Sequence, residues 1–294
     1  MTATATTGTV IADKVPPRKS KPPKERVSWS ATTLIALGSL FILIPLYFTI
    51  AMALKTQAQS TGSGFQFPTS IRWANFSDAW ELVDFPRAAT VSILIAIVAV
   101  AGEVLISAGA AWAIARNFDN KLFKYSFYYI LAAMFIPFPV VALAQIRLTA
   151  AVHIDNPFGV ALLHILFSLP FNILLFTAFI RTIPVTLEES SAIDGCTPWR
   201  TFTRVVFPLL GPMSATVGIF AFLGSWNDFM MPSLITANAS HQTLPVVQNV
   251  FAGSLSANYN VAMASYLLAM APSIIGYLFA QRFVISGVMR GAVK

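Results

Sequence analysis

The sequence has little charge and a single cysteine. Asp, Glu, Lys and Arg together make up 11% of its 294 residues, whereas 56% are hydrophobic; a soluble domain carries roughly 25% charged residues. Cys196 has no second cysteine to pair with, which excludes an intramolecular disulfide and argues against Cys-based redox or metal chemistry. Because the apolar residues come in long blocks, we predict one membrane domain instead of soluble domains.

Catalytic motifs are also missing. The sequence contains no Gly-x-x-x-x-Gly-Lys-Ser/Thr phosphate loop, no Gly-x-Ser-x-Gly and no His-Glu-x-x-His. Its histidines, His153, His164 and His241, lack the spacing of metal ligands. We therefore expect no catalytic residue, no metal and no cofactor bound by this chain, and an intramembrane enzyme would lack a nucleophile and a base.

Six segments are long and apolar enough to cross a membrane as helices, which takes roughly 20 residues. They are residues 31–54, 88–115, 125–146, 158–180, 209–236 and 261–280. The fifth is the least uniform, because Asn227 and Asp228 fall in its second half. Residues 1–27, rich in Pro, Lys and Thr, are predicted to form a disordered basic tail. The predicted fold class is an all-α integral membrane protein with six transmembrane helices.

The basic residues predict the orientation. With the N-terminus inside, fifteen of the nineteen Lys and Arg residues lie on the cytoplasmic side. The four on the outer side are Lys55, Arg72, Arg87 and Arg147. Cytoplasmic loops carry the excess of positive charge, so both termini are predicted to be cytoplasmic. The net charge is +7, and the basic residues flank the apolar blocks instead of being interleaved with stacking aromatics. We therefore expect contact with membrane lipid and not with nucleic acid.

Two outer connections differ in character. Residues 55–87 contain Trp73, Phe76, Trp80 and Phe85, which suit a short helix at the membrane interface. Residues 237–260 contain no Lys or Arg. That second loop is a candidate docking surface for an extracellular partner, and an ordinary solvated loop is an equally good interpretation.

The stretch "EESSAIDGCTPWRTFTRVVFPLLGP", residues 188–212, interrupts the apolar blocks. In the middle of a bilayer its charged residues would together cost on the order of 12 to 17 kcal/mol, so the loop of residues 182–208 is predicted to be cytoplasmic. The charged residues are Glu188, Glu189, Asp194, Arg200 and Arg204.

Local signals in this 182–208 loop predict two short helices. Thr186 and Glu189 form a capping-box pattern, which predicts a helix beginning at Leu187. Gly195 can take the left-handed conformation that ends a helix. Thr197 followed by Pro198 predicts the cap of a second helix that runs to about Phe207, before Pro208. Helices this short need a packing partner, either another protein or the cytoplasmic ends of the chain's own spans.

The same stretch resembles the EAA loop of ABC-importer membrane subunits. Glu189 aligns with the Glu of that motif, Asp194 and Gly195 with its Asp-Gly pair, and Pro208 with its terminal Pro. Ser190 and Ser191 stand where the family has Ala-Ala, and both are small. The resemblance implies that these residues, together with Glu188, couple the chain to an ATPase.

Three other stretches resemble the sugar-transporting, maltose-type branch of this family. They are "SAGAAWAIAR", "SWNDFMMP" and "QRFVISGVMRGAVK", so that the resemblance covers residues 28–294. It implies the type I ABC importer permease fold in a bacterial plasma membrane. It also implies a second homologous permease subunit, a dimer of cytoplasmic ATPases that bind ATP and Mg, and an extracellular binding protein that delivers a sugar. Pro137, Pro139 and Pro170 are candidate hinges.

Polar residues within the spans are candidates for a translocation pathway. Glu103 is a lone carboxyl in the second span, where it either serves transport or is hydrogen-bonded to Ser107 or a neighbouring helix. His164 and Asn172 are eight residues apart in the fourth span and share a face, which also suits plain hydrogen bonding between helices.

Trp226, Asn227 and Asp228 combine an aromatic ring with hydrogen-bonding groups, as a sugar site requires. The structural alternative places Trp226 in the interfacial aromatic belt and gives Asp228 a local capping role. An ion-coupled secondary transporter or channel that uses Glu103 or Asp228 is the alternative function, although no convincing repeat relates residues 31–146 to residues 158–280.

Overall fold

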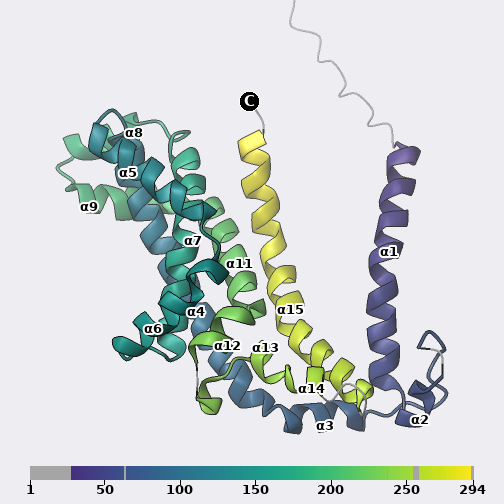
Figure 1. Ribbon diagram of the computed structural model, residues 1–294. Helices are drawn as coiled ribbons and strands as arrows, with labels where there is room; N and C mark the ends of the chain where they lie inside the picture. The colour runs from purple at the N-terminus through teal and green to yellow at the C-terminus, as the bar shows by residue number, and fades with distance from the viewer. Residues whose placement is uncertain (1–27, 63, 237, 254–257, 293–294) are drawn as a thin grey trace, which may run out of the picture. The chain divides into compact units, whose positions relative to one another are not determined.

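The computed structural model describes residues 28–62, 64–236, 238–253 and 258–292. The predicted tail, residues 1–27, lies outside the described residues. The described residues form helices and connecting turns without a β-strand (Figure 1), which confirms the all-α class.

The helices follow one another closely along the chain. The α-helices are α1 (Trp29–Leu54), α2 (Gln57–Ser60), α3 (Ala74–Leu82), α4 (Phe85–Arg116), α5 (Lys121–Ala132), α6 (Phe138–Ala151), α7 (Pro157–Ile180), α8 (Thr186–Ile193), α9 (Pro198–Thr201), α10 (Phe207–Leu209), α11 (Gly211–Asn227), α12 (Met230–Ile235), α13 (Leu244–Val247), α14 (Val250–Gly253) and α15 (Tyr259–Ala292). The 3-10 helices are η1 (Ala133–Phe135) and η3 (Ala239–His241), and η2 (Phe202–Val206) is a π-helix.

Four helices are long and apolar enough to cross a membrane, judged over the described part of the chain. They are α1, α4, α7 and the Tyr259–Leu278 part of α15. Two bent pairs raise the number to six if each pair is one span: Lys121–Phe135 with Phe138–Ala151, bent by 100°, and Pro198–Leu209 with Gly211–Asn227, bent by 76°. The third and fifth predicted spans therefore correspond to bent helix pairs in the structure.

The third predicted span, residues 125–146, is broken at Ile136 and Pro137. Ile136 has an extended backbone (φ −93°, ψ 102°) and α6 begins after Pro137. A proline disfavours the helical conformation of the residue before it and lacks an N–H for a helical hydrogen bond. The break thus falls at Pro137, one of the candidate hinges, whereas α7 continues through Pro170, another of them.

The fifth predicted span, residues 209–236, ends early. α11 stops at Asn227, and Asp228 has an extended backbone (φ −73°, ψ 123°). Asp228 Oδ1 accepts hydrogen bonds from the N–H groups of Met230 (3.0 Å) and Met231 (3.4 Å), in the first turn of α12. An Asp side chain that binds nearby backbone N–H groups favours a helix start over a helix interior, so one helix gives way to two.

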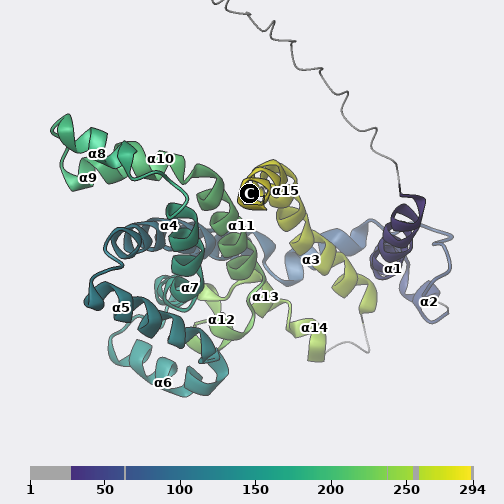
Figure 2. The same cartoon turned by 90° about the horizontal axis from the view of Figure 1, so that it is seen from above.

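The chain divides into two units at Pro45, within α1, and the site lies in the unit that begins at Leu46. In this second unit α4 packs along α7, and α11 lies between α4 and α15 (Figures 1 and 2). The contact face of α4 is rich in small buried residues, which allow helices to approach closely. These are Ala88, Ala96, Ala99, Ala108 and Ala111.

The predicted interfacial helix and the second outer loop are both ordered where described. α3 lies where the aromatic pattern predicts a short helix, and Trp73 and Trp80 remain exposed. Arg87 Nη1 donates to the carbonyls of Ala239 (2.9 Å) and Ser240 (3.1 Å). These bonds fasten the start of the second outer loop to α4.

Candidate functional site

The 182–208 loop lies at one end of α4 and α7, as Figure 1 shows. Its first helix, α8, begins at Thr186, one residue earlier than predicted, and Val185 occupies the cap position without a side-chain hydrogen bond. The predicted capping box is therefore wrong. The turn begins instead at Pro184, whose carbonyl accepts the N–H of Leu187 at 3.4 Å, because a proline with fixed φ starts a helix without a side-chain cap.

The elbow between the two helices forms as the sequence predicts. Gly195 has φ +79°, and its N–H donates to the carbonyl of Ala192 at 3.0 Å. Only a residue without a Cβ takes this conformation without strain. Thr197 Oγ1 then accepts the N–H of Arg200 at 3.4 Å, and Pro198 is the first residue of α9.

The second helix of the loop does not stop before Pro208. It continues through the π-helical turn η2 into α10, which contains Pro208 and ends at Leu209. Pro208 has no N–H for the carbonyl of Arg204, and the wider π turn accommodates this missing bond. The bend comes later, at Leu210, where the helix axis turns by 76° into α11.

One face of the loop is fastened to α4. Glu188 Oε1 accepts from Arg116 Nε at 2.7 Å and lies 2.6 Å from Arg116 Nη2, and Glu188 Oε2 accepts from Trp112 Nε1 at 2.9 Å. The side chains of Arg116 and Glu188 are only 15% and 11% exposed. Glu188, not its neighbour Glu189, therefore holds the loop to the end of α4.

The two helices of the loop are also joined to each other and to the core. The hydroxyls of Ser191 and Thr201 are 2.8 Å apart and both residues are buried. Phe202 is buried with its ring 5.2 Å from that of Trp112. A small residue at position 191 lets α8 lie against α9, so the inner side of the loop is packed and hydrogen-bonded.

The outer side of the loop is apolar and uncovered. Ile193 is 86% exposed and Trp199 is 70% exposed, and Leu187 is exposed as well. Glu189, Ser190, Asp194 and Gly195 are exposed beside them. Ile193 and Trp199 are not part of the motif and were not predicted, although large apolar side chains in a polar stretch are themselves a signal.

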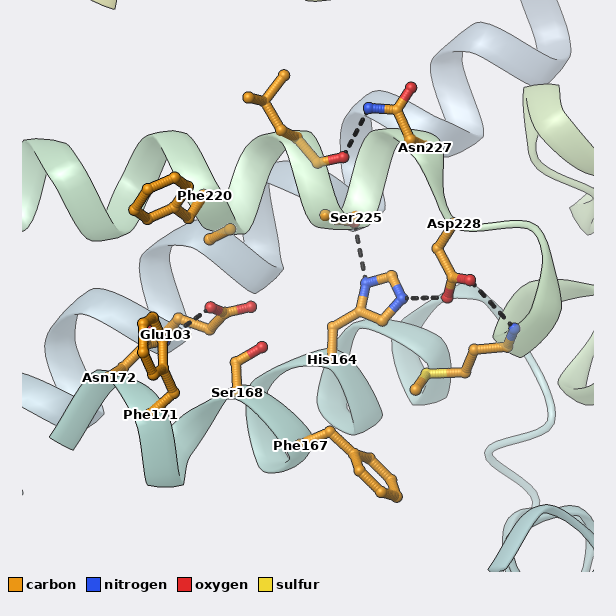
Figure 3. A pocket seen from close by; sticks show the side chains of 14 residues that line it. Glu103, His164, Phe167, Ser168, Phe171, Asn172, Phe220, Ser225, Asn227 and Asp228 are labelled. Atoms are coloured by element: carbon orange, nitrogen blue, oxygen red, sulfur yellow. Dashed lines mark hydrogen bonds and ion pairs between the residues drawn. The ribbon is translucent and has the colours of Figure 1, made fainter. Parts of the chain in front are cut away.

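A cavity of about 510 Å³ lies farther along the same helices (Figure 3). Four helices, α4, α7, α11 and α12, and the break after α11 contribute to its wall. The lining residues are Glu103, His164, Phe167, Ser168, Phe171, Asn172, Phe220, Ala221, Leu223, Gly224, Ser225, Asn227, Asp228 and Met231. Five of the six polar residues predicted for a pathway thus line one cavity, although they come from three separate spans.

Glu103 is paired across the helix interface. Its Oε2 accepts from Asn172 Nδ2 of α7 at 2.9 Å, and both residues are buried. Ser168, one turn before Asn172, lies beside the same carboxylate (Figure 3). Of the two partners proposed from the sequence, the neighbouring helix is therefore the one that the structure provides.

His164 connects α7 to the end of α11. Its Nδ1 lies 3.0 Å from Ser225 Oγ, and its Nε2 lies 2.9 Å from Asp228 Oδ2. Because Asp228 also caps α12, one carboxylate joins α7, α11 and α12. A metal site is not formed here, since the described residues contain no group of three His, Cys, Asp or Glu side chains that could hold an ion.

Trp226 does not line this cavity. Its side chain is 2% exposed, and its Nε1 donates to the carbonyl of Ala269 in α15 at 3.1 Å. The aromatic surface in the cavity comes instead from Phe167, Phe171 and Phe220. Sequence reasoning missed these three residues, because phenylalanine is common throughout apolar spans.

The sequence matches a known family over most of its length. Residues 104–290 fit the model of the binding-protein-dependent transport system inner membrane components. The chain belongs to this family. The matched range contains the whole 182–208 loop and the cavity residues of α7 and α11, so both features lie within the part of the chain that the family shares.

Individual relatives agree with the family assignment. The chain is 30% identical over 269 residues to the multiple sugar-binding transport system permease protein MsmG of Streptococcus mutans, which covers 89% of this chain and 95% of that protein. It is also 30% identical over 266 residues to the melibiose/raffinose/stachyose import permease protein MelC of Bacillus subtilis, covering 90% and 95%.

A solved structure agrees with the fold. A chain of a bacterial ABC transporter for import of the acidic polysaccharide alginate superposes with a TM-score of 0.72 at 21% identity, over 86% of this chain and 95% of that one. The type I ABC importer fold implied by the motifs is thus found in the structure.

Proposed function

We propose that this chain is the membrane-spanning subunit of an ATP-driven importer for a sugar or oligosaccharide. A separate ATPase subunit supplies the energy, and an extracellular binding protein delivers the solute. The names of the similar permeases support a sugar as the solute. The chain is then not itself an enzyme, and ATP and Mg belong to the partner.

The observation that carries this proposal is the two-sided build of the 182–208 loop. Glu188 fixes its inner side to α4 and Ser191 joins α8 to α9, while Ile193 and Trp199 on its outer side are uncovered. Burying one such side chain in a partner contributes about 1.5 to 3 kcal/mol. A rigid, apolar protrusion of this kind suits a groove in the ATPase dimer, so that closure of the ATPases moves α4 and α11 through the loop.

The orientation of the chain in the membrane indicates where the remaining partners bind. The excess of Lys and Arg on one side favours cytoplasmic termini and a cytoplasmic 182–208 loop. The outer loop held by Arg87 then lies outside the cell, where a binding protein docks. A second homologous permease completes the pathway, of which the cavity around Glu103 and His164 is this chain's part.

Replacing Ile193 by Glu tests the proposal. The charged side chain cannot enter an apolar groove, so capture of the co-expressed ATPase subunit should fall about tenfold or more. Ile71→Glu is the matched control, because Ile71 is also exposed but lies in the first outer loop. We expect normal capture of the ATPase by that variant.

Uptake into vesicles supplies the second half of the test. Sugar uptake should require ATP and the ATPase subunit, and it should persist when an uncoupler removes the ion gradient. Uptake that an uncoupler abolishes in the presence of ATP would instead show an ion-coupled transporter. Equal ATPase capture by Ile193→Glu and Ile71→Glu would remove the docking role of the loop.

A further inference from the structure

We propose that the cavity between α4, α7 and α11 is a solute subsite selective for sugars that are neutral or carry an ammonium group. Sugars that carry carboxylate, sulfonate or phosphate groups bind it poorly. This inference rests on the proposed function and narrows its substrate class. The selectivity is for the charge of the sugar and arises in the part of the pathway that this chain lines.

The wall of the cavity contains acidic side chains and lacks Lys and Arg. Two carboxylates, Glu103 and Asp228, line the cavity, and its lining residues include no Lys or Arg. The one other titratable side chain of the lining is His164, whose Nε2 is already 2.9 Å from Asp228 Oδ2. An anionic sugar therefore meets two carboxyl groups, and the one side chain that could offer it a positive charge already contacts Asp228.

Polar side chains of the cavity wall donate hydrogen bonds to other protein atoms. Asn172 directs its amide N–H to Glu103, and Asn227 directs its amide N–H to the carbonyl of Leu223 at 2.8 Å. The hydroxyl of Ser225 is paired with His164. Each of these three side chains thus already spends a hydrogen bond on a protein atom, while the carboxylate oxygens of Glu103 and Asp228 can each accept several bonds.

A ligand that suits such a wall must supply the donors. Sugar hydroxyls donate, and ammonium groups donate and add a positive charge. Carboxylate and sulfonate groups only accept, so few donors of this wall compensate their desolvation. The hydrogen-bonding pattern of the wall therefore favours the same sugars as its charge does.

Part of the cavity wall is aromatic. Phe171 and Phe220 are 44% and 55% exposed, and both lie close to Glu103 (Figure 3). The faces of aromatic rings carry partial negative charge, which attracts cations and C–H groups of a sugar ring and disfavours anions. The cavity volume of about 510 Å³ is within the range for small-molecule sites.

The test uses the complete importer, with its companion permease and ATPases, in lipid nanodiscs and without the binding protein. Calorimetry measures the binding of three probes at equal ionic strength: raffinose, which is neutral; the fully deacetylated chitosan disaccharide, which is cationic; and digalacturonate, which is anionic. We expect raffinose and the cationic disaccharide to bind at least about tenfold more tightly than digalacturonate. Digalacturonate binding as tightly as raffinose overturns the inference, and so does the absence of binding by all three at millimolar concentration.

A variant assigns the selectivity to this chain. Glu103→Gln keeps the shape and an accepting oxygen but removes the charge, so the preference for the cationic disaccharide over raffinose should shrink severalfold. Glu81→Gln is the matched control, since Glu81 is exposed in α3 and does not line the cavity. An unchanged preference in Glu103→Gln that still assembles with its partners overturns the role of Glu103, and the wild-type panel decides the inference if the variant fails to assemble.

ATP-driven uptake separates this inference from the proposed function. ATP-dependent import of an acidic sugar, with tight binding of digalacturonate, overturns the subsite inference and leaves the importer intact. Loss of ATP dependence for every sugar overturns the proposed function and this inference with it.

Discussion

Replacing Arg116 by Ala removes the charge that holds the 182–208 loop to α4. The substitution deletes both contacts of the guanidinium with Glu188 Oε1 and its hydrogen bond to the carbonyl of Ile183, which is 3.1 Å long. Glu188 then keeps Trp112 Nε1 as the donor described for it, in a site where it is 11% exposed.

The expected loss of stability follows from this burial. Breaking a fully buried ion pair by removing one partner costs about 3 to 5 kcal/mol, and an exposed pair is worth about 1 kcal/mol or less. The Arg116 and Glu188 side chains are 15% and 11% exposed, so solvent screens them slightly. We therefore expect Arg116→Ala to cost about 2 to 4 kcal/mol.

A double-mutant cycle measures this interaction directly. Arg116→Ala, Glu188→Ala and the double variant are unfolded in detergent, and limited proteolysis reports whether the loop is released. The double variant should be less destabilised than the sum of the single variants by about 1 to 3 kcal/mol, because it leaves no unpaired buried charge. Arg72→Ala is the control, since the Arg72 and Asp78 side chains are 47% and 45% exposed.

Two outcomes would contradict this role of the Arg116–Glu188 pair. If Arg116→Ala and Arg72→Ala change the stability by the same small amount, the ion pair does not hold the loop. Additive single variants would likewise show that Arg116 and Glu188 act independently.

Two further predictions concern Gly195 and Asn172. Gly195 has φ +79° and a Cβ there would meet nothing within 4 Å, so a substitution costs backbone strain and not a clash. ATPase capture should therefore decrease from Gly195→Asn to Gly195→Ala and be lowest in Gly195→Val. Equal capture by all three variants would contradict the role of the elbow. Asn172→Leu should destabilise the chain by about 1 to 3 kcal/mol in detergent unfolding, because Glu103 loses its amide donor; an unchanged unfolding midpoint would contradict the bond of 2.9 Å.

The sequence predicts those features that depend on the solvent or on a few neighbouring residues. An apolar chain in lipid must satisfy its backbone within each segment, so long apolar blocks predict helices. Gly195 and the Thr197-Pro198 pair act within one turn, and the structure confirms both. Where two local signals compete, the sequence does not tell which one prevails. Thr186 was predicted to cap a helix that begins at Leu187, but the turn starts at Pro184 and the helix begins at Thr186.

Tertiary structure alone decided which residues meet. Glu188 and Arg116 are 72 residues apart, and Glu103 and Asn172 are 69 apart. The helical period tells which residues share a face, but it does not tell which neighbouring helix that face contacts. Trp226 shows the difference, since its position beside Asn227 and Asp228 suggested a common site, whereas the rotation of α11 turns its ring to α15. Neighbouring residues on a helix point about 100° apart, so the packing of α11 between α4 and α15 decides which of them face the cavity.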